Sequence, residues 1–242
     1  MTIFISVLFI FLFHAVVNVA LPFKKNKLQQ QNNSPVVKII SPTDNSTIAP
    51  GRPLHYLITI SDKEDGESKY DEINPKEVLL EVKYTGDAST QTGTLKTVKD
   101  DAPGLAAIRT SNCFNCHGID SKVIGPTFTE INKKYKPTAS NIALLSKRIR
   151  EGSTGIWGKV PMPTHPEITN AQIQNMVKWI MQNATGKALN YYIGTEGSFN
   201  LKVPAEAGNN GAFILTASYT DHGTNNTGQR LKGTDVIVVR IK

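Results

Sequence analysis

The stretch SNCFNCHGID, Ser111 to Asp120, holds both cysteines of this 242-residue chain, two residues apart and with a histidine directly behind them. A C-x-x-C pair has several uses in proteins, among them a disulfide, a redox pair and half of a zinc site. The sequence around the pair decides among these uses. It also decides what the histidine adds.

Two of these uses fit poorly. Structural zinc takes four protein ligands, and the chain has no further cysteine and only five scattered histidines. A thioredoxin-type pair belongs to a βαβ pattern, whereas the sequence here predicts helices. C-x-x-C-H is instead the attachment signature of a c-type haem, in which two thiols bond the porphyrin vinyl groups and the histidine is held on the iron. The motif occurs once, so we expect one covalently attached haem c, bound through Cys113, Cys116 and His117.

The second axial ligand of such a haem is a methionine, another histidine or an open position. Met162 lies in GIWGKVPMPTHPE, residues 155–167, where flanking prolines stiffen the backbone and glycines permit tight turns. Met176 and Met181 fall in a predicted helix, where core packing explains them better. His165 is the rival ligand in the same loop as Met162.

Strand signals lie on both sides of this region. VVKIIS, PLHYLITI and EVLLEVKY precede it, and LNYYIG, GSFNLKVP, GAFILTASYT and TDVIVVRI follow it. Each group alone is small, but together they supply about seven or eight strands, enough for an immunoglobulin-like sandwich. We therefore predict an all-α domain, 98–187, inserted into an all-β sandwich formed by 36–97 and 188–242. Two separate small β modules are the alternative.

The insert is expected to contain three helices. The first opens near Asp101 to Pro103, and the second runs from a cap at Thr138 or Ser140 to Gly152. The third begins at a capping box, Thr169 to Gln172, and repeats apolar residues at the spacing of a buried stripe. Trp179 beside that stripe is expected to be core.

The ordered set CFNCHG, VIGPTF, KKY, GSTGIWGKVPMP and MVKWI resembles a class I monohaem cytochrome c of the bacterial c551/c552 type, over roughly residues 98–185. The resemblance implies helices around a haem with one exposed edge, and electron transfer without a bond-making substrate. It implies thioether bonds from both cysteines, axial ligation by His117 and Met162, and a Pro126 carbonyl that accepts the imidazole N–H. It also implies a hydrogen bond from the Trp157 indole to a haem propionate, with simple packing on the haem edge as the alternative.

The flanking strands are similar to PKD-like or immunoglobulin-like modules. A β-module split around such a cytochrome is similar to the C-terminal region of some bacterial PQQ-dependent sugar dehydrogenases. No propeller sequence to hold PQQ accompanies it, so the resemblance implies an acceptor module for a separate dehydrogenase.

The N-terminus begins with an apolar run from Ile3 to Phe13, which fits a signal peptide over 1–20, followed by a polar linker over 21–35. A signal peptide predicts that the protein is periplasmic or secreted, and an uncleaved leader would associate it with a membrane. The net charge is +7, but no Lys/Arg-dense run with interleaved aromatics indicates a nucleic-acid partner. A basic docking rim for a dehydrogenase or terminal oxidase, or else a solvated face, is predicted at Lys133, Lys134, Lys136, Lys147, Arg148 and Arg150.

We expect an electron carrier and not an enzyme, because ligation by histidine and methionine leaves no open position on iron. The alternatives are a haem-containing subunit of an oxidoreductase complex, and an envelope module whose sandwich docks a partner or glycan. Acidic residues near position 65 suit a solvated turn better than a calcium site: Asp62, Glu64, Asp65 and Glu67.

Overall fold

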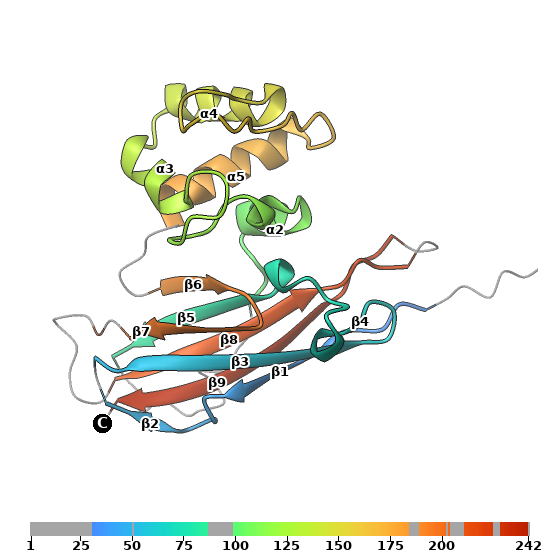
Figure 1. Ribbon diagram of the computed structural model, residues 1–242, viewed down its shortest axis with the longest axis vertical. Coiled ribbons are helices and arrows are strands. Elements are labelled where there is room, and N and C mark those ends of the chain that lie inside the picture. Colours follow the sequence, from blue (N-terminus) through green and yellow to red (C-terminus); the bar gives the residue numbers. More distant parts are fainter. Residues whose placement is uncertain are drawn as a thin grey trace, which may run out of the picture.

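The computed structural model has a part made of strands and a part made of helices (Figure 1). The residues it describes are 31–49, 51–86, 99–183, 189–201, 203, 211–224 and 228–241. The predicted leader, most of the predicted linker and both predicted boundaries of the insert lie outside the described residues. No helix in the described ranges is long and apolar enough to cross a membrane.

Two sheets make up the sheet region, which is formed by described residues 31–86 and 189–241. One sheet is built around β3 (Pro53–Asp62), which pairs with β1 (Val36–Ser41), β4 (Gly66–Glu67) and β7 (Glu196–Asn200). The other has the order β2-β9-β8-β5-β6, with bounds Thr47–Ile48, Lys232–Ile241, Ala212–Thr220, Leu79–Thr85 and Leu189–Ile193. All pairs are antiparallel except β2 with β9. The strands predicted on both sides of the insert are confirmed.

The alternative of two separate β modules is wrong, because strands from the two halves pair with each other. β7 pairs with β3, and β8 pairs with β5. Alternation along β3 places every second side chain inward, as expected for a strand with one solvated face. The inward residues of the two sheets form one core that includes Tyr56, Ile58, Ile60, Leu80, Phe213, Leu215, Tyr219 and Val239.

The helical region, described residues 99–183, lies between β5 and β6 in the chain. It contains α2 (Pro103–Thr110), the 3-10 turn η3 (Cys113–Asn115), α3 (Phe128–Lys134), α4 (Ala139–Glu151) and α5 (Asn170–Asn183). α5 packs against the other three α-helices. β5 and β6 pair with each other, so the chain leaves the sheet from one strand and returns on its neighbour, with the helices above that edge (Figure 1).

Local capping signals account for where these helices begin. The Thr138 side chain caps α4, and Thr169 with Gln172 forms the predicted capping box of α5. The expectation of three helices is wrong, because α3 is a fourth. Its own capping box was present in the sequence: Thr127 Oγ1 accepts from Glu130 N at 3.0 Å, and Glu130 Oε2 accepts from Thr127 N at 2.8 Å.

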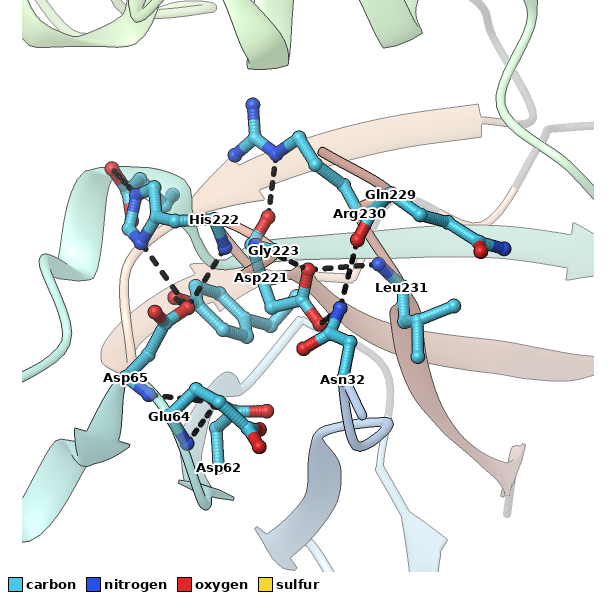
Figure 2. A network of polar contacts seen from close by, with 12 residues as sticks. Asn32, Asp62, Glu64, Asp65, Asp221, His222, Gly223, Gln229, Arg230 and Leu231 are labelled. Atoms are coloured by element: carbon cyan, nitrogen blue, oxygen red, sulfur yellow. Dashed lines mark hydrogen bonds and ion pairs between the residues drawn. The ribbon is translucent and has the colours of Figure 1, made fainter. Parts of the chain in front are cut away.

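The acidic residues after β3 form a structural turn (Figure 2). Asp62 Oδ1 accepts from the backbone N–H groups of Glu64 and Asp65, at 2.9 and 2.7 Å. Asp65 Oδ2 in turn accepts from the Tyr219 hydroxyl at 2.7 Å and from the backbone N–H of His222 at 2.9 Å. The cluster therefore joins the β3 turn to the end of β8. Among the residues described, no three or more His, Cys, Asp or Glu side chains lie together in a group that could hold a metal ion.

A buried polar cluster around Arg109 and Asp101 joins the helical region to the five-stranded sheet. Arg109 in α2 pairs with Asp101 at 2.8 Å and donates to Ser218 Oγ and to the Ser218 carbonyl in β8, at 3.0 and 3.1 Å. Its guanidinium also donates to the Glu77 carbonyl at 3.3 Å, and Lys232 of β9 reaches Asp101 at 2.6 Å. The Arg109 side chain is only 5% exposed, so this pair lies inside the protein.

Candidate functional site

A single cavity of about 380 Å³ in the helical region brings the candidate residues together. Its walls are largely apolar and come from all four α-helices and from the loop between α4 and α5. All six residues singled out in the sequence line it: Cys113, Cys116, His117, Pro126, Trp157 and Met162. Side chains 49 positions apart in sequence are thus placed on one cavity by the folding of the loop onto the helices.

The attachment motif is wound into a tight turn. η3 carries Cys113, and the backbone N–H groups of Cys116 and His117 both donate to the Cys113 carbonyl, at 3.2 and 2.9 Å. Burial raises the pKa of the Cys113 thiol to about 12, so this thiol stays protonated at neutral pH.

His117 is held by one hydrogen bond and one close backbone approach. Its Nδ1 lies 2.7 Å from the Pro126 carbonyl, which can only accept, so Nδ1 carries the proton and Nε2 keeps its lone pair. Burial lowers the pKa of the imidazole, which favours this neutral form. A Cβ at Gly125 would lie 2.7 Å from the ring, so only glycine fits there.

The Met162 loop is closed by a short antiparallel bridge. Met162 N donates to the Ser153 carbonyl at 2.8 Å, and Ser153 N donates back at 3.2 Å. A Cβ at Gly152, whose φ is +81°, would lie 2.8 Å from the Met162 carbonyl, so glycine permits this approach. Arg150 secures the far end of the loop by donating to the carbonyls of His165 and Pro166, at 3.2 and 2.7 Å.

The other loop residues differ in exposure. Trp157 is 37% exposed, and Lys134 Nζ lies 4.5 Å from the centre of its ring, a cation–π contact. His165 also lines the cavity, and its Nδ1 lies 3.0 Å from Glu167 Oε1. Met176 contributes to the wall from α5 but is 1% exposed and belongs to the core, as does Trp179.

The donors present fit a covalently bound haem. Two thiols, a neutral imidazole with a free Nε2 and a thioether all face an apolar cavity, and glycines stand where a side chain would collide with the imidazole or with the Met162 loop. Sequence reasoning missed Phe128, whose ring stacks on His117 with centroids 5.6 Å apart and planes 14° from parallel. The capping box from Thr127 to Glu130, which contains Phe128, was the signal that could have placed it at the start of a helix.

Comparison with known proteins identifies this region. Residues 102–184 match the family described as cytochrome c. The chain is 37% identical over 78 residues to cytochrome c-551 of Azotobacter vinelandii, covering 32% of this chain and 94% of that protein. It is 43% identical over 74 residues to cytochrome c2 of Rubrivivax gelatinosus, covering 30% of this chain and 87% of that protein. Among solved structures, Nitrosomonas europaea cytochrome c552 is 31% identical, with a TM-score of 0.31; the match covers 32% of this chain and 96% of that chain.

The helical region is therefore a class I monohaem cytochrome c domain of the c551/c552 type. Through that domain, the chain belongs to the cytochrome c family. Its cofactor is haem c, covalently attached, and Cys113 and Cys116 fit the C-x-x-C-H motif. These relatives match about a third of the chain, and the family match ends before β6.

Proposed function

We propose that this protein is an exported, periplasmic or secreted, electron carrier that moves single electrons between separate redox proteins. The observation that carries the proposal is the meeting of the C-x-x-C-H turn and the Met162 thioether on one apolar cavity. The apolar run from Ile3 to Phe13 supports export.

Each candidate residue has a specific role in this proposal. The thiols of Cys113 and Cys116 would hold the haem by adding across its two vinyl groups, one C–S bond each, with no oxidant consumed. His117 Nε2 and Met162 Sδ would ligate the iron, and the Pro126 carbonyl holds the imidazole through Nδ1–H. Trp157 donates its indole N–H to a propionate.

The bound haem supplies one-electron chemistry by cycling between Fe(II) and Fe(III). The protein's part is to keep both axial positions filled by its own side chains, so that no substrate reaches the iron. The apolar walls keep water away. On this proposal the protein is not an enzyme.

The surface around the cavity mouth supports docking of a redox partner. Three exposed apolar residues that line the cavity, Ile124, Ile156 and Val160, are 52%, 40% and 66% exposed. Lys122 and Lys159 lie among them. We infer an acidic partner surface, such as that of a dehydrogenase, facing this rim.

For the rest of the chain we propose one immunoglobulin-like or PKD-like sandwich, 36–97 and 188–242, interrupted by the cytochrome domain at 98–187. Pairing of β3 with β7 and of β5 with β8 supports this division. From the sequence resemblance of the split β-module to the C-terminal region of some bacterial PQQ-dependent sugar dehydrogenases, we propose a dehydrogenase as the electron donor.

The absorption spectrum of the purified protein tests the proposed ligands. The oxidised protein is expected to show the far-red charge-transfer band of methionine-ligated Fe(III), and Met162→Ala is expected to abolish it. His165→Ala is the matched control, since this residue lines the same cavity, and it should keep the band. A high-spin wild-type spectrum with ready carbon monoxide binding would overturn the carrier proposal.

A further inference from the structure

A row of aromatic rings connects the attachment motif to the five-stranded sheet. His117 stacks on Phe128, Phe128 meets the Trp179 ring edge-on at 6.3 Å between centroids, and Trp179 meets Tyr191 at 5.4 Å. The first three residues belong to the cytochrome domain. Tyr191 does not, because it lies in β6, beyond the residues that match the family.

The row is tightly packed along its length. Phe128, Trp179 and Tyr191 are 2%, 3% and 6% exposed, and all three belong to one core cluster that also contains Leu79 of β5. Close-packed interiors have little free volume, so a ring cannot shift without moving its neighbour. The position of Tyr191 therefore limits where the Trp179 and Phe128 rings can lie.

The sheet holds Tyr191 more firmly than a loop would. β6 pairs with β5, with Tyr191 opposite Glu81 and Tyr192 opposite Leu80. Tyr191 faces the helices, whereas Tyr192 faces the sheet core and stacks on Phe199 at 4.1 Å and 16°. Two tyrosines next to each other in sequence thus point to opposite sides of the strand, as the strand period requires.

Besides the close approach of Gly125, the Pro126 carbonyl and the Phe128 face restrain the His117 ring. A hydrogen bond at Nδ1 fixes one atom of the ring, and the stacked phenyl group limits rotation of the ring plane about that contact. The orientation of an axial imidazole affects its bonding to iron, and hence the reduction potential and the ferric EPR signal.

We propose that Tyr191 is a positioning residue for the haem site: acting through Trp179 and Phe128, it fixes the plane of His117 from the sheet. The sheet region then belongs to the electron-transfer site as its proximal support. This inference rests on the proposed function, because it takes His117 as the axial ligand.

The test compares Tyr191→Ala, Tyr191→Phe and Tyr192→Ala in the full-length, haem-loaded protein. Ferric EPR g values, the reduction potential and the unfolding temperature are measured for each. Tyr191→Ala is expected to change the g values and shift the potential, and Tyr191→Phe, which keeps the ring, is expected to restore both. Tyr192→Ala is expected to lower the unfolding temperature while leaving the g values and the potential unchanged, because its ring packs in the other core.

Equal g values and potentials in wild type and Tyr191→Ala would overturn the inference, as would equal shifts in Tyr191→Ala and Tyr192→Ala. If Tyr191→Ala does not fold, Tyr191→Leu replaces it and is judged by the same two outcomes. A wild-type protein without a low-spin signal would instead defeat the proposed function, so the two failures are distinguishable.

Discussion

β3 and α4 bury their apolar residues in different ways. Alternate β3 side chains are almost fully buried against other side chains, Ile58 at 1% and Ile60 at 3%. α4 carries a comparable apolar stripe, yet it has no fully buried residue, and Leu145 and Ile149 line the cavity instead. The sheet region therefore completes its core with its own side chains, whereas the helical region depends on its cofactor to cover one face of α4.

Removing the two cysteines that attach the haem is expected to have the largest effect, and it should affect the helical region much more than the sheet region. The double variant Cys113→Ala, Cys116→Ala, purified without haem, should lose hydrogen-exchange protection in α4, because the sides of Leu145 and Ile149 that line the cavity then lie open. Protection in β8 should persist, since that strand lies inside the sheet core. Hydrogen exchange read by mass spectrometry measures both elements in one sample. Joint loss of protection in α4 and β8 would show that the two regions do not differ in this way.

The second-largest effect is expected from breaking the buried ion pair of Arg109 and Asp101, both of which also contact the five-stranded sheet. Arg109→Met leaves Asp101 without one of its two cationic partners, and breaking such a buried pair costs about 3–5 kcal/mol. Burial raises the pKa of the Asp101 carboxyl, but Arg109 and Lys232 outweigh it, and the net pKa lies below its usual value. Urea unfolding of the haem-loaded protein measures the loss.

Lys147→Met is the matched control for Arg109→Met. Its partner Glu151 lies one helical turn away, and both side chains are more than half exposed, so the change should cost no more than about 0.5 kcal/mol. A loss below about 1 kcal/mol in Arg109→Met would mean that the ion pair adds little to the joint between the regions.

The smallest effect is expected at the turn in Figure 2, where His222 lies between two carboxylates. Its ring nitrogens are 3.1 Å from Asp65 and 3.2 Å from Glu77, and these carboxylates outweigh burial and raise the pKa of His222. The stabilisation is therefore present below about pH 6.5 and is lost as the pH rises through the folded-state pKa. The His222 side chain is half exposed, so solvent screening keeps the contribution below about 1 kcal/mol.

The pKa shift of Asp65, and the pH dependence of stability that follows from it, run in the opposite direction to those of His222. Burial raises the pKa of its carboxyl, but Tyr219 and His222 outweigh burial and the net pKa is lowered, so this contribution is lost as the pH falls below about 4. Stability from the turn should be greatest between about pH 4 and 6.5. Melting temperatures should fall as the pH rises above about 6.5 in the wild type, and less so in His222→Ala. His55→Ala is the control, because His55 of β3 contacts Ser198 of β7 within the four-stranded sheet and not at this turn. Identical pH profiles for all three proteins would contradict the prediction.

Several elements were predictable because their signals are local. The capping box at Thr169 lies within four residues of chain, and the alternation of β3 needs only its own sequence. α3 was missed although its signal at Thr127 is equally local, which is an error of interpretation and not a limit of the sequence.

The surroundings of charged residues were much less predictable. Of the basic residues expected to form a rim, Arg148 lines the cavity, whereas Arg150 donates to backbone carbonyls of the Met162 loop and to the side-chain oxygen of Asn170 at the start of α5. Lys122 and Lys159 lie at the cavity instead. A charge run shows that a surface is basic, but the path of the chain decides which of its members face the site.

By itself the sequence determined the cofactor and its attachment motif, because C-x-x-C-H is a covalent motif whose meaning depends on spacing alone. Only the tertiary structure decided that Tyr191 contacts Trp179 and that Arg109 is buried against Ser218. It also decided that β5 pairs with β6, although the whole helical region separates these strands in the sequence. These contacts join residues that no local pattern relates. They depend on how the helical region and the five-stranded sheet pack against each other.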